Sequence, residues 1–102
     1  MNGGPLPREA RLAAIRAALE RALSPLELQV VDDSARHAGH AGARDGRGHF
    51  NVDVVSAVFE GMAPLARHRA VYAALGSLME TDIHALSINA RAPAERGHGR
   101  AD

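Results

Sequence analysis

The sequence predicts an α+β fold, a two-layer sandwich in which one three-stranded sheet carries helices on one face. Two long segments repeat apolar residues at steps of three and four, a pattern typical of amphipathic helices. Three shorter segments alternate apolar and polar residues, which is typical of strands with one buried face. The chain has 102 residues, which suits one small domain. A single sheet covered by the helices would bury every one of these apolar stripes.

The first helix is expected over residues 8–23. It follows a lead-in, residues 1–7, that contains two glycines and two prolines and should be flexible. Pro7 suits the first position of a helix, and Ser24-Pro25 ends it because the residue before a proline avoids helical backbone angles. The apolar stripe of this helix consists of Leu12, Ile15, Leu19, Ala22 and Leu23.

Two strands are expected next, over residues 26–31 and 49–55. Their buried faces consist of Leu26, Leu28 and Val30 in the first and of Phe50, Val52 and Val54 in the second. Residues 34–48 between them hold four glycines and form a long loop, so the two strands should be antiparallel. At the end of the first strand, Asp32 and Asp33 favour a turn over a pair of catalytic carboxylates.

The second half of the chain begins with residues 57–61, which are expected to form a turn or a short helix. A second long helix opens at Pro64, and Gly76 weakens this helix without having to end it. Its apolar stripe consists of Leu65, His68, Val71, Tyr72, Leu75, Leu78 and Met79.

The last strand is expected over residues 84–90, where Leu86 and Ile88 alternate with polar residues. Residues 93–102 should form a disordered tail, because they are polar and terminal. The domain is therefore predicted to span residues 8–92.

The charge and residue composition exclude several classes of function. Twelve basic residues, all of them arginine, balance twelve acidic ones, and this neutrality argues against a protein that binds nucleic acid over its whole surface. The chain has no cysteine, so by itself it supplies no disulfide, catalytic thiol or all-cysteine metal site. No apolar run reaches the length of a membrane span and no enzyme motif is present, so we expect a cytoplasmic protein that is not an enzyme.

Histidine is the residue type that points most directly to chemistry, because imidazole is a common metal ligand near neutral pH. His37 and His40 lie in the glycine-rich loop at H-x-x-H spacing, although loop histidines are often only solvated. His84 shares the parity of the apolar residues of the last strand, so its side chain should start toward the buried face. As the first residue of that strand it can still reach solvent, or it can be satisfied by backbone groups. His68 lies on the apolar stripe and is expected in the core.

Two arginines of the second long helix are candidates for contact with an anion. Arg67 and Arg69 flank His68 and could hold a nucleic-acid phosphate or a carboxylate of a partner. The alternative is an ordinary solvated helix face.

Together these residues resemble the BolA family. The matching stretches read DDSARHAGH, GHFNVDVVSAVFEG, RHRAVY and IHALSI, in the order and spacing of that family, and the resemblance spans about residues 8–92. It implies an α-β-β-α-α-β fold related to class II KH domains. The family position in the loop matches His37, so the chain resembles the histidine-loop type, and the second family ligand matches His84. The glycine-rich loop also offers His40 as a substitute ligand.

The resemblance implies a partner role in iron–sulfur biology. Members of the family pair with monothiol glutaredoxins and, with glutathione, bridge a [2Fe-2S] cluster. No cluster is expected in the isolated chain, which should be a monomer or a weak homodimer. Some members are described as DNA-binding transcriptional regulators linked to stress, cell shape and biofilm formation, and this is the alternative function.

Overall fold

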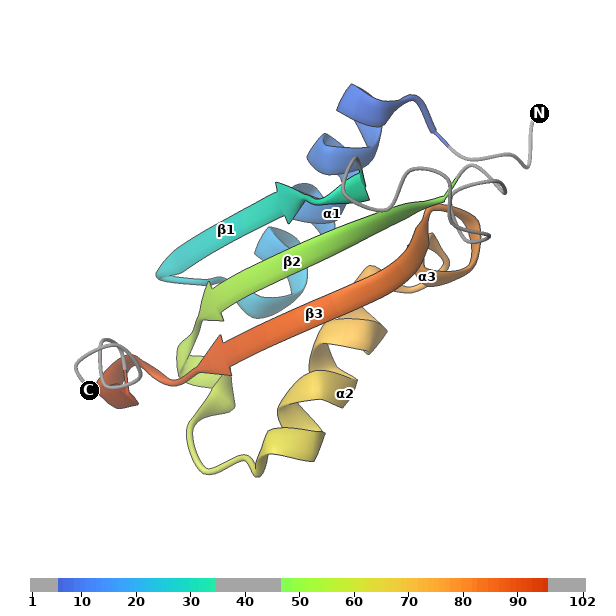
Figure 1. The fold of residues 1–102 in the computed structure, drawn as a ribbon. Coiled ribbons are helices and arrows are strands. Elements are labelled where there is room, and N and C mark those ends of the chain that lie inside the picture. The colour runs from blue at the N-terminus through green and yellow to red at the C-terminus, as the bar shows by residue number, and fades with distance from the viewer. Residues whose placement is uncertain (1–5, 35–46, 96–102) are drawn as a thin grey trace.

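A computed structural model describes residues 6–34 and 47–95 of the chain. The elements are α1 (Arg8–Leu23), β1 (Glu27–Asp32), β2 (Gly48–Val55), η3 (Ala57–Phe59), α2 (Pro64–Leu75), α3 (Leu78–Thr81), β3 (Ile83–Arg91) and η4 (Pro93–Glu95). Figure 1 shows the ribbon, with the three strands side by side. The α+β fold class predicted from the sequence is confirmed, and the short helix expected near residue 59 is η3.

The sheet has the strand order β1-β2-β3, so β2 lies in the middle. β1 and β2 are antiparallel, as the joining loop predicts, from the pair Glu27 and Val55 to the pair Asp32 and Phe50. β2 and β3 are parallel. The chain between them must return to the same end of the sheet, and it does so through α2 and α3.

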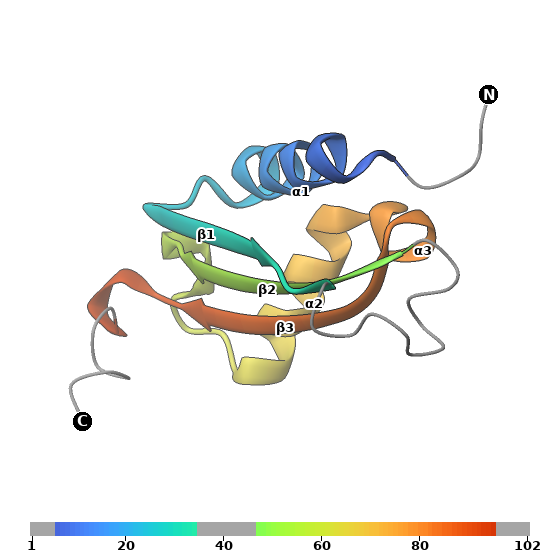
Figure 2. The ribbon, with the colours of Figure 1, turned by 45° about the horizontal axis from the view of Figure 1, so that its top comes forward.

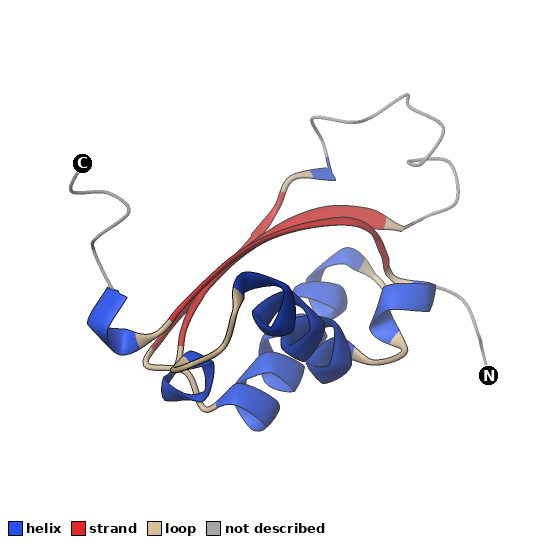
Figure 3. Cartoon of the chain, turned by 90° about the horizontal axis from the view of Figure 1, so that it is seen from below, coloured by secondary structure: helices blue, strands red, loops and turns tan. Residues whose placement is uncertain are grey.

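Within residues 6–34 and 47–95, the helices cover only one face of this sheet, and the other face, called the bare face below, carries none of them (Figures 2 and 3). The covered face and the helices share one apolar core. Its buried members are Ile15, Ala18, Leu19, Leu23, Phe50, Val52, Val54, Phe59, Val71, Leu75, Ile83 and Ala92. Burial of a large side chain of this kind contributes about 1.5–3 kcal/mol, so this layer contact holds the fold together.

The buried face of α1 differs from the predicted stripe, because Arg11 is buried while Leu12 is only half-buried, and because two alanines exchange roles. Ala22 is exposed, whereas Ala18 is buried. The buried line runs along Ile15, Leu19 and Leu23 at steps of four. Because a helix turns every 3.6 residues, a line of such steps drifts around it, and the position of the sheet decides which neighbouring alanine is covered.

The second long helix is shorter than predicted, because Gly76 does end it. Gly76 has a φ of +56°, and its N–H donates to the carbonyl of Tyr72. A positive φ is easy for glycine and costly for other residues, so the chain leaves the helix here. Two residues of the predicted stripe are also exposed, Leu65 at 61% and Tyr72 at 43%.

Contacts of the described residues also lie on both sides of residues 8–92, the range predicted for the domain. Leu6 is fastened by a backbone N–H donated to Asp82, at 2.7 Å. At the other end, η4 forms in the predicted tail, and its Glu95 binds Arg67 at 2.6 Å. The first strand also begins one residue later than predicted, because Leu26 lies outside β1 and is 60% exposed.

Candidate functional site

His84 lies on the bare face of the sheet, where it is exposed. The parity of β3 predicts the opposite orientation, and a bulge is the reason for the difference. Gly48 pairs with Ile83 and His49 pairs with Ala85, so His84 is the extra residue of β3. An extra residue interrupts the alternation of faces. Ile83 therefore stays in the core while His84 turns outward.

A second imidazole, that of His49, lies beside His84. The two ring centroids are 5.3 Å apart, and the rings are tilted by 49°. Sequence reasoning placed His49 at a strand start without a role. The alternation of β2 contains the signal, because Phe50 is buried on the helix side and its neighbour must project to the bare face.

Arg47, the last residue before β2, contacts the same cluster. Its Nη2 atom lies 3.4 Å from Nδ1 of His84, and its Nη1 atom lies 3.5 Å from the carbonyl oxygen of Glu80. A guanidinium can only donate, so this contact requires an unprotonated Nδ1 and leaves the proton of the neutral ring on Nε2. A metal bound through Nδ1 of His84 would take the lone pair that accepts from Arg47. A metal bound through Nε2 would move the ring proton to Nδ1, so in both cases Arg47 would be displaced.

The end of β1 is tied to the start of β2 by a turn around Ser34. The N–H of Ser34 donates to Oδ1 of Asp32 at 2.9 Å, and the N–H of His49 donates to the Ser34 hydroxyl at 3.0 Å. This confirms the turn role predicted for Asp32. His37 and His40 belong to residues 35–46, which lie outside the described residues.

Gly48 allows the close approach at this turn. A Cβ atom at Gly48 would lie 2.6 Å from the Ser34 hydroxyl oxygen and 2.8 Å from the ring of Phe50. Such distances are far inside ordinary van der Waals contact, so a Cβ atom at this position would force the Ser34 or Phe50 side chain to shift.

A buried carboxylate supports the start of β3. Asp82 is 1% exposed, and its Oδ2 atom accepts hydrogen bonds from the Leu6 N–H at 2.7 Å and from Nε of Arg11 at 3.2 Å. Oδ1 accepts from the Thr81 hydroxyl at 2.5 Å. Burial raises the pKa of Asp82, but the hydrogen bonds and the arginine outweigh it and hold that pKa below its ordinary value. Neither Arg11 nor Asp82 stands out in the sequence, because they meet only in the folded chain.

The two arginines proposed for anion contact have different environments. Arg67 is engaged inside the protein, where it donates to both carboxylate oxygens of Glu95 and to the carbonyls of Met62 and Ala90. Arg69 is exposed on α2. The structure therefore offers Arg69, and not Arg67, to an outside anion. His68, between them, is half-buried, so the core position expected for it is only partly reached.

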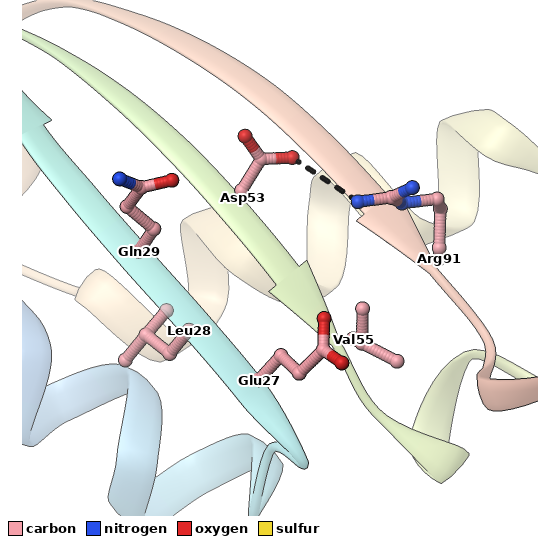
Figure 4. A pocket seen from close by; sticks show the side chains of 6 residues that line it. All are labelled: Glu27, Leu28, Gln29, Asp53, Val55 and Arg91. Atoms are coloured by element: carbon pink, nitrogen blue, oxygen red, sulfur yellow. Dashed lines mark ion pairs between the residues drawn. The ribbon is translucent and has the colours of Figure 1, made fainter. Parts of the chain in front are cut away.

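Two open hollows lie on the bare face of the sheet. One, of about 180 Å³, is lined by Asp33, His49, Asn51 and Ser87 among others, so it adjoins the histidine cluster. The other lies at the far end of the sheet and has a volume of about 250 Å³. Figure 4 shows that its side chains include Asp53 and Arg91, which form an ion pair at 3.5 Å. Both hollows are polar and shallow features of a solvated face, and of the two only the first is lined by an imidazole, that of His49.

Comparison with protein families decides the relationship of this chain. The model of the family described as BolA-like protein matches residues 19–95. The chain belongs to the BolA family. The resemblance seen in the sequence is thereby confirmed at the level of the family.

Relatives in this family come from bacteria, plants and animals. BolA-like protein 1 of Mus musculus is 51% identical over 83 residues, which cover 81% of this chain and 58% of the mouse protein. The protein named DNA-binding transcriptional regulator BolA, from Escherichia coli, is 40% identical over 75 residues, which cover 74% of this chain and 69% of that protein. Because the chain spans little more than half of the mouse protein, it need not share every property of that whole protein.

A solved structure agrees with the fold. The BolA domain of SufE1 from Arabidopsis thaliana has a TM-score of 0.74 and 41% identity, with 88% of this chain and 98% of that domain covered. Within residues 6–34 and 47–95, no helix is long and apolar enough to span a membrane. The same residues contain no group of three or more histidine, cysteine, aspartate or glutamate side chains arranged to hold a metal ion.

Proposed function

We propose that this BolA-family protein is a partner of a monothiol glutaredoxin and co-ligates a [2Fe-2S] cluster shared with that protein and glutathione. Its role lies in cluster assembly, cluster trafficking or iron regulation, without catalysis of its own. The ligands from this chain are His84 and His37, with His40 as the substitute. The observation that supports the proposal most is the bulge of β3, which turns His84 outward to within 3.4 Å of Arg47 at the end of the histidine-bearing loop.

The side chains of this site fit such a cluster as half of its ligand set. His84 is exposed and its imidazole can supply a nitrogen ligand once Arg47 is displaced, and the chain has no cysteine. In the described part of the chain the donors are too few for a complete metal site. The remaining ligands must then come from the loop and from the thiolates of the partner. Exchange of thiolates for imidazoles removes negative charge from a [2Fe-2S] cluster and raises its reduction potential.

The test mixes the chain with a monothiol glutaredoxin, glutathione, iron and sulfide, and records visible absorption and circular dichroism. We expect a mixed-complex spectrum that changes for His84→Ala and for His37→Ala. His98→Ala in the tail is the matched control and should leave the spectrum unchanged. If His40→Ala changes the spectrum and His37→Ala does not, the loop ligand is His40. If both His84→Ala and His37→Ala give the wild-type spectrum, the ligand assignment is refuted.

The second candidate function is DNA-dependent regulation, and the name of the Escherichia coli relative favours it. The exposed Arg69 would contribute a phosphate contact, whereas Arg67 is engaged by Glu95. Formal neutrality of the whole chain reduces the expected affinity.

Binding to a labelled duplex, measured by fluorescence anisotropy at increasing salt, tests this second function. A protein that contacts phosphates loses affinity steeply with salt. We expect Arg69→Ala to weaken binding and to flatten the salt dependence, whereas Glu20→Gln on α1 should do neither. Weak binding without a salt slope would exclude the regulator function.

A further inference from the structure

Two arginines on the first turns of α1 reach two carboxylates at the ends of different strands. Nε of Arg8 lies 3.0 Å from Oδ2 of Asp32, at the end of β1. Nε of Arg11 lies 3.2 Å from Oδ2 of Asp82, directly before β3. β1 and β3 are not neighbours, because β2 separates them. One helix turn therefore links the two outer strands at the end of the sheet where the histidines lie.

Each of these aspartates is linked to the strand that carries His49, Asp32 indirectly through Ser34 and Asp82 through its backbone carbonyl. On the β1 side, Asp32 accepts from the Ser34 N–H, and the Ser34 hydroxyl accepts from the His49 N–H. On the β3 side, the carbonyl oxygen of Asp82 accepts from the Gly48 N–H at 2.9 Å. Both ion pairs thus act on the stretch that places the two imidazoles 5.3 Å apart.

Stability alone is a poor explanation for the inner pair. The side chains of Arg11 and Asp82 are 9% and 2% exposed, so both charges have lost most of their water. Buried ion pairs are often replaced by apolar residues of similar size without loss of stability. What an apolar pair lacks is direction, because a guanidinium and a carboxylate fix distance and angle together.

We propose that Arg8 and Arg11 are positioning residues that set the spacing between the base of the histidine loop and His84. Arg8 holds the base of the loop through Asp32, and Arg11 holds the bulged start of β3 through Asp82. This rests on the proposed function, since the spacing matters for a cluster that His84 binds together with a histidine of the loop.

The test uses variants that separate the loss of the fixed ion-pair geometry from a loss of overall stability. Arg11→Met combined with Asp82→Leu removes both buried charges and keeps an apolar contact, so the chain should stay folded. Arg8→Gln removes the outer pair. Arg16→Gln is the matched control on the same helix, because Arg16 reaches Glu20 and the Leu28 carbonyl, both at 3.4 Å, and neither end of the site.

The first readout needs no cluster. Since local opening becomes easier, amide hydrogen exchange of Gly48 and His49 should accelerate about tenfold in the double variant, and less in Arg8→Gln because the Arg8 side chain is largely exposed. The nuclear Overhauser contact between the rings of His49 and His84 should weaken. Exchange in the centre of β2, at Val52, should stay at the wild-type rate, as should every signal in Arg16→Gln. Wild-type exchange and ring contact in both test variants would overturn the proposal.

The second readout is the circular dichroism and reduction potential of the reconstituted complex. We expect both to shift in Arg8→Gln and in the double variant. If the ring contact is lost and the cluster signals stay unchanged, the spacing is irrelevant to the ligands and the positioning role is refuted. Failure of the wild-type chain to form a cluster counts against the proposed function alone, and the exchange experiment then decides the positioning of the rings.

Discussion

Replacement of Gly48 by alanine tests the packing at the base of the histidine site. The new Cβ atom would lie 2.6 Å from the Ser34 hydroxyl oxygen and 2.8 Å from the buried ring of Phe50. Forcing a methyl group into such a space costs about 1–3 kcal/mol. For a domain of this size, each kcal/mol lowers the thermal midpoint by roughly 4–8 °C. We therefore expect Gly48→Ala to fold with a clearly reduced urea midpoint.

A double-mutant cycle identifies the contact responsible. Ser34→Ala alone should cost about 1 kcal/mol, because the His49 N–H loses its acceptor. In the double variant the nearer clash is gone, so the total loss should fall short of the sum by about 0.5–1 kcal/mol. Gly61→Ala is the control, since Gly61 has a φ of +77° and open space around it. It should be destabilised by backbone strain and be additive with Ser34→Ala.

Two results would refute this reasoning. If Gly48→Ala has the wild-type urea midpoint, the close approach is not restrictive. If Gly48→Ala and Ser34→Ala are additive within about 0.3 kcal/mol, the cost does not arise from their contact. Equilibrium urea unfolding with unchanged m-values is the measurement that allows this comparison.

Three further outcomes follow from the burial and charge of other residues. Burial raises the pKa of Asp32 and Asp82, but hydrogen bonds and an arginine outweigh it, so both pKa values lie below the ordinary 3.8. The two carboxylates therefore stabilise the folded state above about pH 4, and this stabilisation is lost as the pH falls through their folded pKa values. A urea midpoint that is constant between about pH 5 and pH 2 would contradict this. Leu75→Ala should lower the stability by about 2–5 kcal/mol because Leu75 is 3% exposed. Leu65→Ala should change the stability by less than about 0.5 kcal/mol because Leu65 is 61% exposed. Equal losses of the two variants in thermal unfolding would show that α2 packs differently. Glu95→Ala should lower the stability by up to about 1 kcal/mol, because Arg67 loses two hydrogen bonds. Glu95→Gln should recover part of this loss. If both variants are as stable as the wild type, η4 contributes nothing to the stability of the fold.

Local patterns determined most of the fold. The alternation of Phe50, Val52 and Val54 and the steps of four along α1 depend only on neighbours in the chain, and each places one side of an element in the core. The loop between the first two strands likewise implied that they are antiparallel, because parallel neighbours are usually joined by a crossover helix and none was expected there. The family, too, was recognisable from residues and their spacing, and residues 19–95 match its model.

The candidate site depended on a single irregularity that periodicity does not show. Parity counted back from Leu86 directs His84 inward, and one bulged residue of β3 directs it outward. A bulge depends on how two strands pair, which no pattern within one strand contains. Gly76 is a similar case, because propensity tolerates a glycine within a helix while the path back to β3 requires a turn.

The sequence by itself determined which residue types this protein has for chemistry, six imidazoles without a thiol, and which segments form helices and strands. Only the tertiary structure decided which of these groups meet. His49 and His84 come together across parallel strands, and Arg11 meets Asp82 although 71 residues separate them in the chain. The physical reason is that local periodicity is set by backbone geometry over a few residues, whereas such meetings depend on strand register and on how α1 lies against the sheet.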